Sequence, residues 1–119
     1  EGDTGGGDMI ETVLRTYLQE ALGCPVWMEV PEAPPKRYII MSRTGGGRSG
    51  RLKTAGILLQ SYAESLYDTA QLNEQVEEAM DAAGALPELC RTELSSSGML
   101  TDPSTKRYRY QALYDIIYY

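Results

Sequence analysis

The feature that most constrains the fold is a succession of strand-type segments placed between two segments with helical periodicity. Residues 10–21 and 65–83 carry apolar side chains three and four positions apart, the spacing of a helix that buries one face. The strand-type segments follow one another directly instead of alternating with helices. This order favours a mainly antiparallel or mixed sheet with helices packed on one face. The sequence therefore predicts a single α+β domain with the element order α-β-β-β-α-β-β.

The first helix has a recognisable beginning and end. Asp8 is placed to cap the first turn with Glu11 three positions later, and Gly23 suits the left-handed position after the last turn. Residues 1–8 are glycine-rich, and we interpret them as a remnant of recombinant expression or a flexible leader, so the domain is predicted to span residues 9–119. The predicted buried stripe consists of Ile10, Val13, Leu14, Tyr17, Leu18 and Ala21.

Three strands are predicted before the second helix. Alternation over residues 26–30 indicates a short strand, and the proline-rich residues 31–35 end it because proline lacks an amide donor. Residues 38–41 form a continuous apolar run, which is typical of a strand buried on both faces, and residues 53–62 form the returning strand. Between these two strands, residues 44–50 (TGGGRSG) are predicted to be a mobile loop, so the pair is expected to be a hairpin with a long flexible tip.

The second helix is predicted to begin at Ser65, with Asp68 as its capping partner, and to end at Gly84 and Pro87. Its two faces differ in polarity. The face expected to pack on the sheet carries Leu66, Thr69, Leu72, Val76, Ala79, Met80 and Ala83. The face expected to point into solvent carries Glu74, Glu77, Glu78 and Asp81.

Two further strands are predicted over residues 89–94 and 107–119, with a loop at residues 95–105. One face of the last strand is rich in tyrosine. Because the chain has no phenylalanine and the arginines of this strand fall on its opposite face, we favour a core role for the tyrosines over a stacking platform for nucleic acid. A subunit interface is the other interpretation, since tyrosine is enriched in such contacts. This face carries Tyr108, Tyr110, Ala112, Tyr114, Ile116 and Tyr118.

The composition excludes several kinds of site. The chain has 119 residues and no histidine, so it has no histidine general base, no Ser-His-Asp or Cys-His nucleophile and no histidine-containing metal site. Cys24 and Cys90 are predicted to be packed thiols in a reducing compartment. We find no catalytic set and expect no enzymatic activity, metal or cofactor. No apolar run reaches the roughly 18 residues of a membrane span and no signal peptide is recognisable, so no membrane partner is expected.

Charge is unevenly distributed along the chain. The net charge is −6, which argues against general coating of nucleic acid. A basic segment, residues 36–53, contains no acidic residue, and an acidic group follows in the second helix. Such segregation is compatible with two faces that meet in self-assembly or with faces that are merely solvated. The basic side chains are Lys36, Arg37, Arg43, Arg48, Arg51 and Lys53.

The glycine-rich residues 45–50 have two interpretations. Consecutive glycines can present backbone amides to a phosphate. However, the segment matches neither established phosphate-loop pattern and leads from strand to strand, so no helix N-terminus follows it. We favour a hairpin tip whose conformational freedom allows it to become ordered against a partner.

Several motifs occur in an order that resembles a known family. Residues 34–65 contain a proline before a strand, a T-G-G-G turn, a strand ending in Q-S-Y-A-x-S, and then an acidic amphipathic helix. The stretch D-P-x-T-x-x-x-R-Y-x (residues 102–111) leads into the last strand. With the first helix and the Pro-Val-Trp at residues 25–27, these features resemble the small tail-terminator or head-tail joining proteins of long-tailed phages and prophages over nearly all of residues 9–119. The Arg-Ser at residues 48–49 departs from the pattern, in which polar residues such as asparagine are expected.

The resemblance implies a structural protein that forms a ring, commonly a hexamer, on the head-proximal end of the tail tube. The ring would stop tube growth and join the head, so its partners would be other copies of the chain, the tail-tube protein and a head-tail connector protein. DNA would only pass through the ring. The protein would reside at the tail end of the virion, and in the host bacterial cytoplasm before assembly.

Two other functions remain open from the sequence. One is a head-closure or neck protein of the same assembly, and the other is a small nucleic-acid-binding module that uses the basic hairpin of residues 36–53. For the ring, the expected contacts between subunits or with the tube come from the hairpin and from the acidic helix face. The candidate residues are Arg43, Gly45, Gly46, Gly47, Arg48, Arg51, Lys53, Glu74, Glu77, Glu78 and Asp81.

Overall fold

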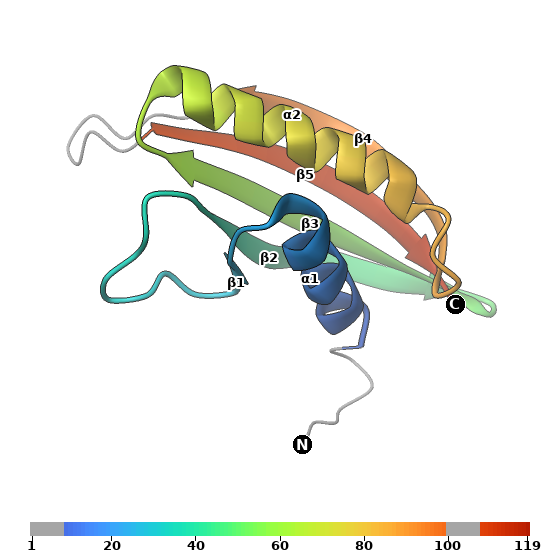
Figure 1. Ribbon diagram of the computed structural model, residues 1–119. Helices are drawn as coiled ribbons and strands as arrows, with labels where there is room; N and C mark the ends of the chain where they lie inside the picture. Colours follow the sequence, from blue (N-terminus) through green and yellow to red (C-terminus); the bar gives the residue numbers. More distant parts are fainter. Residues whose placement is uncertain (1–8, 100–107) are drawn as a thin grey trace.

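Two helices cover one face of a five-stranded mixed sheet, as the sequence predicts (Figure 1). The computed structural model describes residues 9–99 and 108–119. The strands lie in the order β1-β2-β3-β5-β4, and only the β1–β2 pair is parallel. The elements in chain order are α1 (Met9–Leu22), β1 (Val26–Trp27), β2 (Tyr38–Ser49), β3 (Leu52–Ala63), α2 (Leu66–Ala83), β4 (Leu89–Met99) and β5 (Tyr108–Tyr118).

The hydrophobic core lies between the helices and the sheet. The α1 stripe buries Ile10, Leu14 and Leu18, with Val13 and Tyr17 half-buried, which confirms the period read from the sequence. The prediction is wrong for Ala21, in the last turn, which is exposed. All four residues at 38–41 are buried, as predicted for a strand covered on both faces. On β5 the predicted core face is confirmed from residue 112 on, because every second residue of that part is buried, while Tyr108 and Tyr110 are half-buried. The buried residues are Ala112, Tyr114, Ile116 and Tyr118.

The ends of the helices follow local capping rules. Gly23 ends α1 with φ at +67°, and its N–H donates to the Gln19 carbonyl at 3.0 Å. The Ser65 hydroxyl accepts the Asp68 N–H at 3.0 Å, as predicted for the N-cap of α2. The predicted cap at Asp8 lies outside the described residues.

The first strand is shorter than predicted. The sequence indicates a strand over residues 26–30, but β1 consists of Val26 and Trp27 alone, while Met28 is 43% exposed and Val30 is 59% exposed. The reason is topological. Because β1 runs parallel to β2, the chain must leave the sheet and return to the far end before β2 can begin. Residues 28–37 make that connection, so they cannot continue the strand.

Two segments predicted as loops belong to strands. β4 extends to Met99 instead of ending near residue 94, because its whole length pairs with β5. The rest of the loop predicted at residues 95–105 lies outside the described residues from residue 100 on. Residues 44–49, within the predicted mobile loop, form the second half of β2. Local composition therefore underestimates both strands.

The buried face of α2 also differs from the predicted one at two positions. Leu66 is 43% exposed although it shares the helical period of the core positions, because the first turn of α2 lies at the end of the sheet (Figure 1). Asn73, which the pattern does not place inside, is only 4% exposed. The other predicted inner residues, from Thr69 to Ala83, are buried.

Candidate subunit interface

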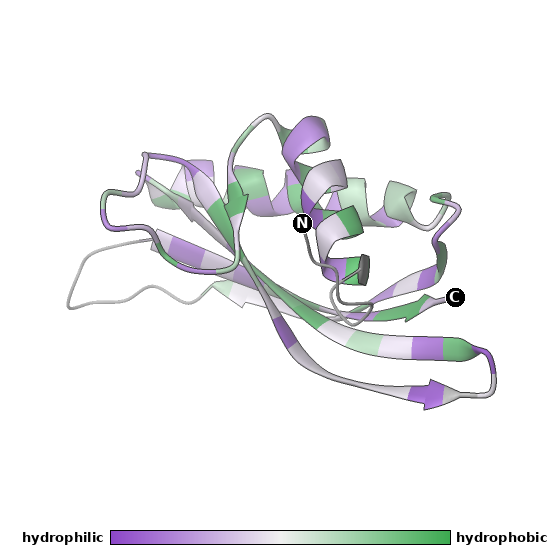
Figure 2. Cartoon of the chain, turned by 90° about the horizontal axis from the view of Figure 1, so that it is seen from below, coloured by the Kyte–Doolittle hydropathy of each residue, from purple (hydrophilic) through white to green (hydrophobic). Residues whose placement is uncertain are grey.

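The β2–β3 hairpin is a continuous two-stranded ribbon. Its turn lies at Gly50 and Arg51, and Gly50 adopts φ of +62°, a conformation that favours glycine. Gly46 pairs with Ala55 and Gly47 with Thr54, so the glycine-rich segment is held by a neighbouring strand. The prediction of a mobile loop is therefore wrong. The ribbon curves away from the helical layer at its end (Figure 2).

Close approach of the chain explains glycine at particular positions of this ribbon. A Cβ at Gly46 would lie 2.7 Å from the Thr54 carbonyl oxygen, which is backbone and cannot move aside cheaply. A Cβ at Gly56 would collide with the Thr44 hydroxyl. By contrast, a Cβ at Gly45 would meet nothing within 4 Å. Packing against the backbone therefore requires glycine at Gly46, whereas at Gly56 only the exposed Thr44 side chain would have to move, and at Gly45 nothing would.

This difference predicts opposite outcomes for two neighbouring substitutions. We expect Gly46→Ala to lower the free energy of unfolding by about 1–3 kcal/mol, because the added methyl group overpacks a filled site. Gly45→Ala, the matched control, should change it by less than about 1 kcal/mol, since the methyl group enters open space and reduces unfolded-state freedom. Urea denaturation followed by circular dichroism measures both, and equal stabilities of the two variants would contradict the packing explanation.

The two basic residues before β2, Lys36 and Arg37, form contacts with other residues at one end of the sheet. The Lys36 ammonium lies 4.0 Å from the Glu64 carboxylate, and both side chains are largely exposed. Arg37 donates to the Leu22 carbonyl at 3.2 Å and to the Gln75 side chain at 2.6 Å. These contacts tie the connection before β2 to both helices, so Lys36 and Arg37 do not continue into the hairpin surface.

Within the hairpin, two basic groups have partners of their own. The Arg43 guanidinium forms an ion pair of 3.3 Å with Glu11 of α1. The Lys53 ammonium lies 5.7 Å from the centre of the Tyr118 ring, in the geometry of a cation–π contact. Each of these side chains therefore also stabilises the fold.

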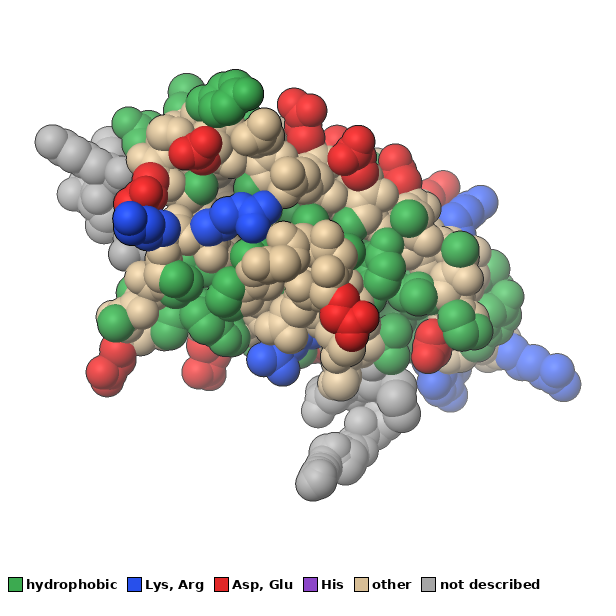
Figure 3. Space-filling view, in the orientation of Figure 1, with side chains coloured by type: hydrophobic (Ala, Val, Ile, Leu, Met, Phe, Trp, Pro, Cys, Tyr) green, Lys and Arg blue, Asp and Glu red, His purple; other side chains and the backbone are tan. Residues whose placement is uncertain are grey.

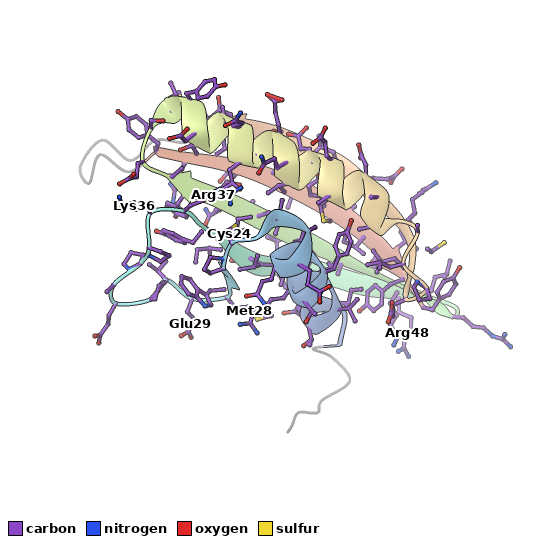
Figure 4. The ribbon with its side chains drawn as sticks, in the orientation of Figure 1. Cys24, Met28, Glu29, Lys36, Arg37 and Arg48 are labelled. Carbon is purple, nitrogen blue, oxygen red and sulfur yellow. The ribbon has the colours of Figure 1, made fainter. Side chains whose placement is uncertain are left out.

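Arg48 and Arg51 are the exposed basic residues at the end of the ribbon. In the part of the chain that the structure describes, neither forms an ion pair. Figure 4 shows Arg48 near the end of the hairpin, far from Lys36 and Arg37. The basic segment of the sequence is thus divided in space, and its two arginines without an ion pair lie at the hairpin end.

The acidic residues of α2 do not all behave alike. Glu74, Glu78 and Asp81 are exposed, as predicted. Glu77 is half-buried and accepts hydrogen bonds of 2.8 Å from the Asn73 amide and from the Ser97 hydroxyl of β4. The prediction that Glu77 points into solvent is therefore wrong, because a polar partner on a distant strand draws it toward the sheet.

The contact of Glu77 with β4 shows which way the acidic stripe, defined as Glu74, Glu77 and Asp81 of α2, faces. Glu74 and Asp81 lie three positions before and four positions after Glu77, so they occupy the same side of α2. That side faces the β4 edge of the sheet.

The acidic residues also act on the core. Burial raises the pKa of the Tyr114 phenol beneath the helix, and the charges of Glu77 and Asp81 raise it further.

The candidate residues therefore gather at opposite edges of the molecule. α1 lies over β1 and β2, where Arg15 donates to the Val26 carbonyl at 2.7 Å, and α2 lies over β4 and β5 (Figure 1). The glycines and arginines of the hairpin form the β2 edge, and the acidic stripe overlooks the β4 edge. Figure 3 shows acidic groups gathered along the α2 side of the molecule. The structure does not bring the two sets together within one chain.

One feature of the surface was not anticipated from the sequence. Trp27, Tyr38 and Tyr62 form an aromatic cluster on the sheet face away from the helices, and the two tyrosine rings stack with their centres 4.7 Å apart. The cluster adjoins a pocket lined in part by Pro34 and Lys36. Only the register of β2 with β3 places these rings together, so no local pattern signals the cluster. Glu64, the ion-pair partner of Lys36, lines the same pocket.

The described residues contain no cluster of metal-ligating side chains and no helix that is long and apolar enough to cross a membrane. The two cysteines differ. Cys24 is buried, as predicted, and burial raises the pKa of its thiol although Arg37 acts in the opposite direction. Cys90 is exposed, so the prediction of a packed thiol is wrong there. Cys90 lies at an irregularity of β4 between Leu89 and Arg91, which the sequence does not reveal.

This difference predicts selective labelling of the native protein. With a maleimide near neutral pH, Cys90 should react readily, whereas Cys24 should react only after unfolding, because it is buried and its raised pKa keeps it protonated. Intact-mass spectrometry with peptide mapping counts and locates the label. Rapid modification of Cys24 in the folded protein would contradict the described core.

A scan against protein-family models finds no match to this sequence, and a search of curated proteins finds none that is significantly similar.

Proposed function

We propose that this protein is a non-enzymatic structural component of a phage or prophage tail, which forms a ring that ends the tail tube and provides the head-tail joining surface. The observation that carries the proposal is the placement of free basic groups and of an acidic stripe at opposite edges of one small domain. The motif order of the sequence supports the same assignment.

Opposite charges at opposite edges favour head-to-tail association of copies. Such a contact is heterologous, because one patch meets a different patch on the neighbour, and it closes into a ring when the rotation between copies permits. Arg48 and Arg51 on one side and Glu74 and Asp81 on the other provide the complementary charges, whereas Glu78 lies on the side of α2 that faces Arg37 and the end of α1. A closed ring of such subunits is the form needed to cap a tube.

The nucleic-acid-binding alternative has weaker support. Its basic segment is divided between separate contacts, and Arg109, which donates to the Tyr62 hydroxyl at 3.2 Å and lies over that half-buried ring, is occupied within the fold. Tyr108 and Tyr110 are half-buried. A head-closure role uses the same kind of ring, and the identity of the bound partner distinguishes it from tail termination.

The experiment is size-exclusion chromatography with light scattering, applied to the protein alone and with the tail-tube protein of the phage or prophage that encodes it. We expect the tail-tube protein to convert the chain into a discrete ring-sized complex. A matched sample with DNA at low and moderate salt should show no binding whose affinity falls steeply with salt. Persistent monomers with the tube protein, together with salt-dependent DNA binding, would contradict the proposal.

A further inference from the structure

The β2 strand leaves most of one sheet edge unpaired. β1 pairs only with Ile39 and Ile40, and among the described residues no strand pairs with Met41 to Ser49 on the side of β2 that faces away from β3. An open strand edge presents a row of backbone donors and acceptors to any extended segment. Gly45, Gly46 and Gly47 carry no side chains of their own, and the Arg43 side chain lies over this segment, with its Nε donating to the Gly45 carbonyl at 3.4 Å.

The β4 strand forms the other open edge. Within the described ranges it pairs with β5 alone, along its length from Leu89 to Met99. Its side chains are mostly exposed, and the Arg91 and Glu93 charges on it pair with each other at 3.4 Å. The β4 edge is therefore as available for strand pairing as the β2 edge.

The strand directions make the two edges compatible. In the order β2-β3-β5-β4 every neighbouring pair is antiparallel, so β2 and β4 point in opposite directions. If a second copy is placed beside the first in the same orientation, its β4 runs antiparallel to β2. The alternation of the sheet then continues across the boundary, and both helical layers stay on the same face.

The charges at the two edges match this placement. Arg43 lies on the helix-covered face of β2, where it contacts Glu11. The α2 helix of the added copy would bring Glu74 and Asp81 to the same face at the boundary, because their side of α2 overlooks β4. Arg48, level with Lys53 in the register, lies on that face too. Basic groups at one edge therefore meet acidic groups at the other.

We infer that copies of this chain join by strand addition, with the β2 edge of one copy pairing antiparallel to the β4 edge of the next through backbone hydrogen bonds. The inference rests on the proposed function for its partner, a second copy, and adds the atoms that form the contact. The register across the sheet places Gly47 level with Thr54, Ile117 and Arg91. In an unshifted joint, the exposed Cys90 of the neighbour therefore lies close to Gly47.

A disulfide test uses that proximity. Gly47→Cys adds one thiol at the β2 edge, where a Cβ would make an ordinary contact with the Thr54 hydroxyl at 3.4 Å. Gly45→Cys is a second variant for a shifted register, since its Cβ enters open space. Neither new thiol reaches Cys90 of its own chain, because three strand spacings of about 4.8 Å separate the edges and a disulfide spans about 6 Å between Cα atoms.

The full-length variants are oxidised alone and with the tail-tube protein, and are then separated on a denaturing gel without reductant. We expect a ladder of dimers, trimers and larger species, with loss of the monomer band, because each chain carries both thiols of the joint. Two controls accompany them. Gly47→Cys combined with Cys90→Ser should lose the ladder, and Thr16→Cys, on the exposed side of α1, should give none.

The outcomes separate this inference from the proposed function. A ladder from either edge variant supports strand addition, even where no tube is capped. A product that stops at dimers, and survives Cys90→Ser, would mean that two β2 edges pair symmetrically and would overturn the inference. Absence of a ladder from both variants would overturn it as well, while ring-sized particles of the unmodified protein with the tube would leave the proposed function standing.

Discussion

Replacing Leu72 with alanine is expected to lower the free energy of unfolding by about 2–5 kcal/mol, whereas the same replacement at Leu66 should lower it by less than about 1 kcal/mol. Both residues lie on α2 and share its apolar period. Leu72 is 1% exposed within the core, but Leu66 is 43% exposed at the start of the helix. Removing the first side chain leaves a cavity, and removing the second leaves a surface already in contact with water.

The pair is a matched comparison because the helix, the residue type and the substitution are the same. Urea denaturation gives the free energy of unfolding of both variants, provided that they share the same dependence of this free energy on urea concentration. Since small domains of this size are stable by only about 5–15 kcal/mol, the Leu72 variant should lose a large share of its stability. Equal losses for the two variants would mean that the first turn of α2 packs on the core after all.

Reversing the charge of the hairpin end is expected to abolish assembly, and a complementary reversal should restore it. Arg48→Glu with Arg51→Glu makes both edges of the subunit acidic, so the head-to-tail contact becomes repulsive. Glu74→Lys with Asp81→Lys makes both edges basic, with the same consequence. An equimolar mixture of the two double variants again pairs unlike edges, because each copy finds its complement on the other variant.

Light scattering in the presence of the tail-tube protein measures this effect. We expect particles from the unmodified protein and from the mixture, and none from either variant alone. Lys36→Glu, which reverses one exposed charge away from both edges, is the control and should assemble normally. Normal assembly of each double variant by itself would show that the hairpin end and the acidic stripe do not form the contact between copies.

The parts of the fold that follow from local pattern could be predicted from the sequence. The period of Ile10, Leu14 and Leu18 determines α1, and the cap at Ser65 marks the start of α2. Such signals depend on residues within one or two turns of one another. For the same reason, the α+β order of the elements is readable without knowledge of the sheet register.

The errors arise where distant residues determine the structure. Glycines at residues 45–47 are typical of a loop by themselves, but β3 pairs with them and converts the segment into a strand. Glu77 belongs to an acidic helix face until Ser97 draws it toward β4. The candidate interface was predictable as two charged segments, whereas their placement at opposite edges depends on the strand order, which no local pattern contains.

The central claim is that copies of this chain form a passive ring that ends a tail tube. Electron microscopy of tubes assembled from the tail-tube protein tests it most directly. With the protein present from the start, we predict tubes of limited length that carry an added ring at one end. Tubes as long as those grown without it, with both ends bare, would contradict the account.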